Sequence, residues 1–192
     1  GPGDEVIVPN RTWIATAHAP LMLGAKVILV DVEHNRPIID YSKIAKLITK
    51  RTKAIIPVHM NGRSANMEVI NKIAGEYGIS VIEDAAQAFG SKNINGFLGT
   101  QSTIGIFSLS LTKIISTGQG GFLVTNNDNV ANKLRAIRTH GIENIKEPKS
   151  WVTPGHNFRF NDILASIGLV ELRKLDENIN RLIQIYKQYQ IG

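Results

Sequence analysis

Apolar runs of four to eight residues alternate with longer segments of helical spacing along most of this chain. The apolar runs predict strands at 5–8, 26–30, 54–58, 79–82, 104–111 and 122–125. The segments between them predict helices at 12–23, 41–48, 66–77 and 128–138. Strands that alternate with helices are typical of parallel strands joined by helical crossovers. We therefore expect an α/β fold, with a mostly parallel sheet flanked by helices.

Local signals mark several helix ends. Thr12 and Asp128 are candidate N-caps, while Gly24 and Gly78 follow two of the predicted helices and can terminate them. The segment 141–155 contains Pro148 and has no clear period, so it is expected to form a long loop. Apolar residues then recur at steps of three to five over 161–189, which predicts one long amphipathic helix.

The composition is that of an ordinary globular domain. The chain has 192 residues, of which 43% are hydrophobic and 20% charged, enough for one domain with a substantial core. It has no cysteine, which excludes disulfides and thiolate metal sites. Neither an apolar run of about 20 residues nor a signal-peptide pattern is present. The default expectation is a cytoplasmic protein that does not enter a membrane, and no metal site is expected.

The formal net charge of +6 raises the question of nucleic-acid binding. The basic residues are scattered, however, and their densest run, 50–53, follows a predicted helix, where positive charge complements the helix dipole. No nucleic-acid-binding motif and no interleaved aromatic residues accompany them. A small anionic substrate is the better expectation.

Two stretches carry the candidate chemistry. In the first, Lys113 stands between the hydroxyl-rich segment 107–112 and a turn that contains Gly118, Gly120 and Gly121. A lysine held inside a protein can lose its proton and attack a carbonyl, as Schiff-base chemistry requires. The alternative is a lysine that only completes a loop.

The second stretch runs from 80 to 87, and in it Asp84 follows a predicted strand. Open parallel sheets bind ligands beyond the carboxyl ends of their strands. Asp31 and His59 follow strands as well, and either of them can simply terminate its strand.

Together these stretches resemble the DegT-type family of nucleotide-sugar aminotransferases, which depend on pyridoxal phosphate (PLP). The resemblance covers nearly the whole chain, and its ordered set of motifs is specific. The matching stretches are 3–9, 12–16, 57–59, 83–87, 108–113, 120–125, 140–141 and 157–159. It implies the large domain of the aspartate-aminotransferase-type (fold type I) PLP enzymes. Residues 1–160 would form the PLP-binding core of that domain, and 161–192 the long helix that leads towards a small C-terminal domain.

The resemblance implies that Lys113 carries the cofactor and then acts as acid and base. Asp84 would be the carboxylate partner of the pyridine nitrogen. Its neighbour Glu83 also matches the motif, but alternation along a strand points it to the opposite side.

Further cofactor contacts are implied for Trp13, Gln87, Ser108 and Asn157. Trp13 would stack on the ring, although without the resemblance a tryptophan here is better explained as part of the core. Gln87 would contact the ring or its hydroxyl. Ser108 would donate to the phosphate, and Asn157 would reach the phosphate of the neighbouring subunit.

Three more residues fall on or near matching stretches without a choice between a structural and a substrate-facing role: His140, His156 and Arg159. Asn157 itself has an alternative role, as a cap of the helix that begins near 161 or as part of a turn in its own subunit.

The implied reaction is amino transfer, with glutamate as donor, to a nucleotide-linked keto-sugar. Relatives that dehydrate sugars carry histidine where Lys113 stands. The implied assembly is a homodimer with shared active sites, and the implied pathway makes an amino sugar for a surface polysaccharide or a glycosylated natural product.

Family members extend beyond both ends of this chain. Upstream they have a glycine–threonine or serine–glycine–threonine turn that opens a helix and holds the cofactor phosphate. We therefore expect this sequence to be a central part, whose own activity is a separate question. One alternative is a non-catalytic paralogue or inactive fragment with a role in regulation or assembly. Another is a dinucleotide-binding oxidoreductase, but the glycine turn it needs after its first strand is missing.

Overall fold

A computed structural model describes residues 1–144, 146–147 and 149–191. The chain divides into two compact units. Gly1–Phe107 and Leu123–Asp128 form the first unit, and Ser108–Phe122 and Asn129–Gly192 form the second.

The main sheet has six strands in the order β2-β1-β3-β4-β7-β8. Their bounds are β1 (Glu5–Pro9), β2 (Lys26–Val30), β3 (Thr52–Ile55), β4 (Ser80–Asp84), β7 (Ile104–Ser108) and β8 (Gly121–Val124). β1 pairs in parallel with β2 and β3, and β4 pairs in parallel with β3 and β7. The predicted α/β class with a mostly parallel sheet is confirmed.

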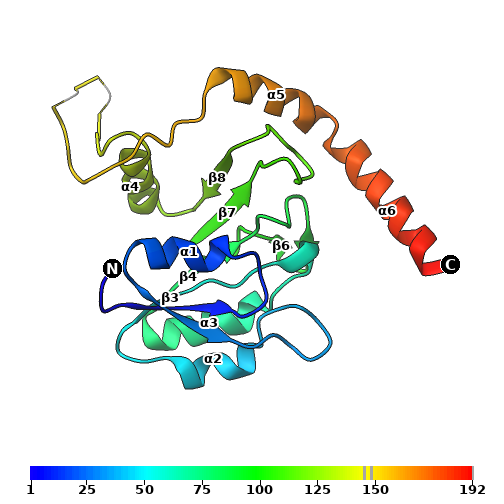
Figure 1. Ribbon diagram of the computed structural model, residues 1–192, viewed down its shortest axis with the longest axis horizontal. Coiled ribbons are helices and arrows are strands. Elements are labelled where there is room, and N and C mark those ends of the chain that lie inside the picture. Colours follow the sequence, from blue (N-terminus) through cyan, green and yellow to red (C-terminus); the bar gives the residue numbers. More distant parts are fainter. Residues whose placement is uncertain (145, 148, 192) are drawn as a thin grey trace. The chain divides into compact units, whose positions relative to one another are not determined.

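Three helices cover the sheet of the first unit: α1 (Ala15–Met22), α2 (Tyr41–Leu47) and α3 (Met67–Tyr77). In Figure 1, α1 lies over one face and α2 and α3 lie over the other. Because successive residues of a strand point to opposite faces, Ile7 joins a core with residues of α2 and α3, while Val6 and Val8 join a smaller core on the side of α1.

The predicted strand at 54–58 is displaced. β3 begins at Thr52 and ends at Ile55, and beyond it Val58 makes only an isolated parallel bridge to Asp84. Pro57 has no amide hydrogen to donate, so the regular ladder cannot pass through it. The predicted bounds of β2 are confirmed.

The ends of α3 follow the expected chemistry. The Asn66 side chain accepts a hydrogen bond from the amide of Val69 at 3.3 Å. Gly78 adopts the left-handed conformation, with φ of 65°, and its amide reaches the carbonyls of Ala74 and Gly75.

The predicted cap of the first helix is wrong. The N-cap of α1 is Ile14, and no side chain caps it. The Thr12 hydroxyl instead lies 3.1 Å from the hydroxyl of Thr16. Thr12 therefore belongs to the turn before the helix, and its hydroxyl is directed at a side chain one turn further on.

The link between β4 and β7 contains a second, two-stranded antiparallel sheet, and a single 3-10 turn precedes α3. These elements are β5 (Lys92–Asn93), β6 (Gly96–Phe97) and η1 (Met60–Gly62). Strands of two residues are too short to show a period in the sequence, so they were not predicted.

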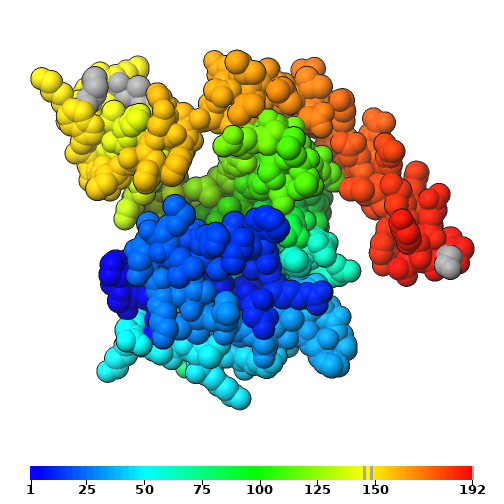
Figure 2. Space-filling model, viewed as in Figure 1, coloured from blue at the N-terminus to red at the C-terminus, as the bar shows by residue number. Residues whose placement is uncertain are grey.

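In the second unit, the predicted single helix over 161–189 is wrong. The segment forms α5 (Asp162–Arg173) and α6 (Leu175–Ile191). They are separated at Lys174, whose amide bonds to the Glu171 carbonyl three residues back. A charge signal marks the break, because basic Arg173 ends one helix and acidic Asp176 opens the next. α6, red in Figure 2, has no buried side chain.

Helix α4 (Asp128–Arg138) begins where it was predicted, with Asp128 in its first turn rather than before it. The long segment after it is irregular, as expected, but two isolated bridges tie it together, Thr139 to Asn157 and Ile142 to Trp151. Pro148, which contributed to the loop prediction, lies outside the described residues. Over the part of the chain that the structure describes, no helix combines the length and apolar character needed to cross a bilayer.

Candidate active site

Asp84 is the last residue of β4, and its carboxylate is partly exposed. One oxygen, Oδ2, accepts a hydrogen bond from the hydroxyl of Thr16 at 2.8 Å. The other, Oδ1, accepts from the amide of Ala86 at 3.1 Å. Since a carboxylate oxygen can accept two hydrogen bonds, both oxygens retain capacity for a further donor. Asp84 is thus held by two groups and can still receive a ligand.

Thr16 also contributes to this site, although no sequence motif points to it. It lies on α1, 68 residues before Asp84, and is buried. The spacing of Thr12 and Thr16 places both on one side of a helical turn, which could have pointed to a hydroxyl pair. Nothing in the sequence, however, places that pair against Asp84.

Glu83 points away from Asp84, as strand alternation predicted, and is fully buried. Its carboxylate lies 2.9 Å from Nε2 of His59 and accepts from the amides of Gly99 at 2.8 Å and Gln101 at 2.6 Å. His59 is fully buried as well. It therefore belongs to the protein interior rather than to the ligand-binding edge.

Asp31, the other residue that follows a strand, has two partners of its own. Its carboxylate accepts from the Asn10 amide at 2.7 Å and from the Lys43 ammonium at 2.9 Å. These contacts join the end of β2 to α2, which accounts for an aspartate at this position.

Gln87 lies three residues after Asp84 and is oriented by a neighbouring turn. Its side-chain oxygen accepts a hydrogen bond from the amide of Asn61 at 3.0 Å. Asn61 has φ of 53°, an uncommon backbone conformation for a residue other than glycine. Because the oxygen is engaged in this way, the side-chain nitrogen of Gln87 is the atom that can donate to a ligand.

Trp13 lies just before α1 and is 72% exposed. The interpretation of Trp13 as a core residue is therefore wrong. A large exposed aromatic ring, three residues before the threonine that holds Asp84, is available to stack on a planar ligand.

Lys113 lies on a loop that closes on itself. The amide of Leu109 donates to Gly120 at 2.9 Å, and the amide of Thr117 donates to Leu109 at 3.0 Å. The lysine amide donates to Ser110 at 3.0 Å. The side chain of Lys113 is partly buried, and no hydrogen bond or ion pair among the described residues engages its amine. The loop thus presents an amine that has no partner among the residues that the structure describes.

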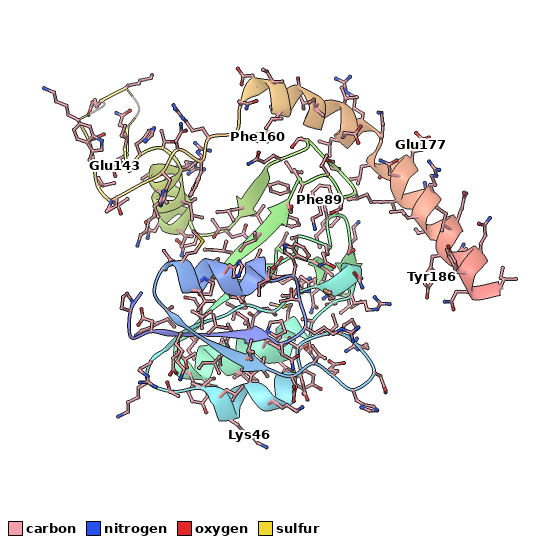
Figure 3. The ribbon with its side chains drawn as sticks, in the orientation of Figure 1. Lys46, Phe89, Glu143, Phe160, Glu177 and Tyr186 are labelled. Atoms are coloured by element: carbon pink, nitrogen blue, oxygen red, sulfur yellow. The ribbon has the colours of Figure 1, made fainter. Side chains whose placement is uncertain are left out.

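The expected glycine turn is present, and its three glycines differ in backbone conformation and position. Gly118 and Gly120 have φ of 81° and 140°, whereas Gly121 begins β8. At Gly120, an added Cβ would lie 2.6 Å from the ring of Phe160, which is labelled in Figure 3. The loop of Lys113 therefore packs against the segment before α5 so closely that only glycine fits.

Ser108 ends β7 and accepts a hydrogen bond at its hydroxyl oxygen from the amide of Ser110, at 3.3 Å. The hydroxyl hydrogen remains available to donate. Ser108 and Lys113 thus lie on one short segment of the second unit, each with a group that can engage a ligand.

Asn157 is exposed, and its side-chain oxygen accepts from Nε of Arg159 at 2.9 Å. It is not a helix cap, because Asn161 caps α5. A hollow of about 500 Å³ in the second unit is lined by Asn157, Arg159, Phe160, Asn161 and Asp162. With its oxygen engaged, Asn157 presents its amide nitrogen as a donor.

Two further candidates, His140 and His156, form backbone and ring contacts within the second unit. The amide of His140 donates to the carbonyl of His156 at 2.8 Å, and the ring of His156 stacks on Phe158. These contacts hold the backbone of His140 and the ring of His156 in place.

The groups present fit the demands of PLP. Within the first unit, Asp84 can accept a hydrogen bond from a pyridinium N–H, Gln87 can donate a hydrogen bond to the cofactor, and Trp13 can stack on its ring. Within the second, Lys113 offers an amine, and Ser108 and Asn157 offer donors for a phosphate.

The model of the DegT/DnrJ/EryC1/StrS aminotransferase family matches residues 1–192. Among solved structures, DesV of S. venezuelae in complex with a ketimine intermediate is 35% identical, with a TM-score of 0.86 over 92% of this chain and 47% of that one. The PLP form of the putative sugar aminotransferase Spr1654 of Streptococcus pneumoniae is 26% identical, with a TM-score of 0.90 over 100% of this chain and 54% of that one.

The solved structure of a dehydratase is also similar to this chain. GDP-4-keto-6-deoxy-D-mannose-3-dehydratase of E. coli, with bound hydrated PLP, is 31% identical, with a TM-score of 0.82 over 92% of this chain and 49% of its own. The chain spans about half the length of these structures.

Proposed function

Because this chain belongs to the DegT/DnrJ/EryC1/StrS aminotransferase family, we propose that it is the cofactor-binding part of a PLP-dependent enzyme that transfers an amino group to a nucleotide-linked keto-sugar. Glutamate is the proposed donor. The observation that carries the proposal is Lys113, an amine without a described protein partner on a loop closed by its own hydrogen bonds. In this proposal residues 1–160 form the core of the large domain, and 161–192 lead out of it.

Bound PLP supplies an electron sink that stabilises negative charge at the reacting carbon of the substrate. Lys113 would hold the cofactor through its amine. Once substrate has taken that place, the free amine of Lys113 can accept and return the proton at the substrate carbon. A single lysine therefore has both a binding and an acid–base role.

Asp84 would keep the pyridine nitrogen protonated. An anionic carboxylate next to this nitrogen favours its charged form. The Thr16 hydroxyl and the Ala86 amide each donate to one oxygen of Asp84. These two donors fix the orientation of the carboxylate.

The remaining residues would bind the cofactor and exclude water. Trp13 would cover one face of the ring, and Gln87 would donate from its side-chain nitrogen to the ring hydroxyl. Ser108 would donate to the phosphate. Asn157 would reach the phosphate of a partner subunit, which makes the proposed enzyme a homodimer with shared sites.

The proposed enzyme acts in the cytoplasm on small substrates, in amino-sugar synthesis for a polysaccharide or a glycosylated natural product. The similarity to a dehydratase raises a second reaction on the same fold. Lysine at position 113 favours amino transfer, since the family resemblance implies histidine at this position in relatives that dehydrate sugars.

Borohydride reduction of full-length protein mixed with PLP, followed by peptide mass mapping, tests the proposal. The adduct is expected on Lys113, and it should be lost in Lys113→Ala and in Lys113→Arg, since a guanidinium group cannot form a Schiff base. Lys92→Ala, a change at a lysine that lies over the Phe97 ring, is the matched control and should leave the adduct intact. An adduct only on other lysines contradicts the assignment, and no adduct at all favours a non-catalytic relative.

A further inference from the structure

The buried pair of His59 and Glu83 has a defined arrangement of hydrogens. The amide of Ala65 donates to Nδ1 of His59 at 3.2 Å, so this ring nitrogen must accept. The other nitrogen, Nε2, then carries the hydrogen and donates to Glu83 at 2.9 Å. If Nδ1 carried a hydrogen, its N–H would point at the N–H of Ala65, and neither group could accept. The hydrogen-bond partners therefore assign the neutral ring with its hydrogen on Nε2.

Glu83 is an ionised carboxylate in this pair. Burial raises the pKa of Glu83, but hydrogen bonds from His59, Gly99, Ser102 and Gln101 outweigh it, so that its pKa lies below the ordinary value. The neutral histidine thus serves as one donor of a cage around a buried negative charge.

This cage is connected to Asp84 through the main chain. The amide of His59 donates to the carbonyl of Asp84 at 3.0 Å, and the amide of Asp84 donates to the carbonyl of Pro57 at 2.9 Å. The strand end that bears Asp84 is therefore bonded to the segment that bears His59.

The residues on both sides of Asp84 are fixed to the same loop. Glu83 accepts the amide of Gly99, and a Cβ added to Gly99 would lie 2.8 Å from the Cβ of Ala85. Asp84 points the other way, towards Thr16. Its backbone is thus held from two directions while its carboxylate is left for the ligand.

We propose that His59 is a positioning residue for Asp84, which it holds in place by donating from Nε2 to the buried Glu83 carboxylate. The inference rests on the proposed function, because the expected effect of losing this hydrogen bond is a weaker contact between Asp84 and the pyridine nitrogen of PLP. Loss of the donor leaves Glu83 with fewer partners and releases the strand end. Asp84 then stabilises the positive charge on the cofactor less well.

Two variants separate the two hydrogen bonds of the ring. His59→Gln can place an amide N–H near the position of Nε2 and keep the donor to Glu83. His59→Asn can place a carbonyl oxygen near Nδ1 and keep the acceptor for Ala65, but it loses the donor. Exposed His34 supplies the matched controls, His34→Gln and His34→Asn.

The readout is the pH midpoint of the visible absorbance of full-length protein saturated with PLP. His59→Asn should shift this midpoint by roughly one pH unit, the lower end of what a neighbouring opposite charge contributes. His59→Gln and both control variants should match the wild type. Equal midpoints in all proteins, or equal shifts in both His59 variants, overturn the inference. Thermal melting without cofactor separates a loss of stability from a shift of the midpoint.

A second measurement needs neither cofactor nor variants. Nitrogen-15 NMR of the cofactor-free protein should show a neutral His59 ring with its hydrogen on Nε2, and a hydrogen on Nδ1 overturns the inference even if His59→Asn does not fold. Absence of any cofactor band in the wild type contradicts the proposed function instead. A normal band with an unshifted midpoint in His59→Asn contradicts the inference alone.

Discussion

At the scale of single residues, Asp84 combines two fixed hydrogen bonds with a partly exposed carboxylate. Asp84→Asn keeps the shape of the side chain and removes its charge. Cofactor attachment should persist, while the half-reaction with amino donor should slow by roughly 10² to 10³, the range for loss of one preorganised electrostatic contact. Stopped-flow absorbance on full-length protein measures this rate.

Asp31→Asn is the matched control for that experiment. Asp31 also follows a strand, but its carboxylate is engaged by Asn10 and Lys43. The control should keep the wild-type rate. Near-normal turnover in Asp84→Asn would mean that another acid partners the pyridine nitrogen.

The buried Glu83 predicts a pH dependence of stability. Because its folded pKa lies below the ordinary value of 4.5, it contributes stability that is fully present above that value. This contribution is lost as the pH falls below 4.5 and through the lowered folded pKa. Denaturant unfolding should therefore show Glu83→Gln to be less stable than wild type at neutral pH, by about 1–3 kcal/mol.

The difference between wild type and Glu83→Gln should shrink as the solution is acidified below the ordinary carboxyl pKa. Glu68→Gln, a change in the first turn of α3, is the control. A gap that stays constant from neutral to acidic pH would show that Glu83 is not ionised in the folded protein.

At the scale of elements, the lysine loop depends on two glycines that differ in their surroundings. Gly118 has φ of 81°, and apart from its chain neighbours no described residue lies within 4 Å of an added Cβ, while at Gly120 the Phe160 ring lies 2.6 Å away. Gly118→Ala should cost about 1 kcal/mol through backbone strain. Gly120→Ala should cost about 3 kcal/mol, because steric overlap adds to the strain.

Denaturant unfolding of the two variants tests this difference. The Gly120→Ala,Phe160→Ala double variant should recover part of the loss relative to Phe160→Ala alone, since the overlapping ring is gone. Equal losses in Gly118→Ala and Gly120→Ala would show that Phe160 does not restrict the loop.

At the scale of the whole molecule, the proposed dimer predicts complementation between subunits. Lys113→Ala chains should be inactive, and Asn157→Ala chains poorly active. If Asn157 serves the partner's site, a mixed dimer has one site with both defects and one site with neither. Activity should therefore rise when the two full-length variants are mixed and allowed to exchange subunits.

Exchange must be confirmed by native mass spectrometry of differently labelled chains, with Lys113→Ala mixed with itself as the control. If subunits exchange and no activity returns, Asn157 serves its own chain. Its bridge to Thr139 and its hydrogen bond from Arg159 would then be its main roles.

Local pattern was sufficient for much of the fold. Period and breaker residues gave the order of the main strands and helices, because side-chain direction in each element repeats at a fixed step. They also gave the left-handed end of α3 at Gly78. The apolar period continues through Lys174, so this pattern predicted one helix there, and only the charges of Arg173 and Asp176 mark the break.

The sequence by itself determined the family, the α/β class and the candidate residues, since these depend on residue type and order along the chain. Only the tertiary structure decided which groups hold the candidate residues in place. Thr16 reaches Asp84 across 68 residues, and the hydrogen on His59 is assigned by contacts with Ala65 and Glu83. Such contacts depend on strand register and helix packing, which bring distant segments together, and no local pattern encodes where a segment will find its partner.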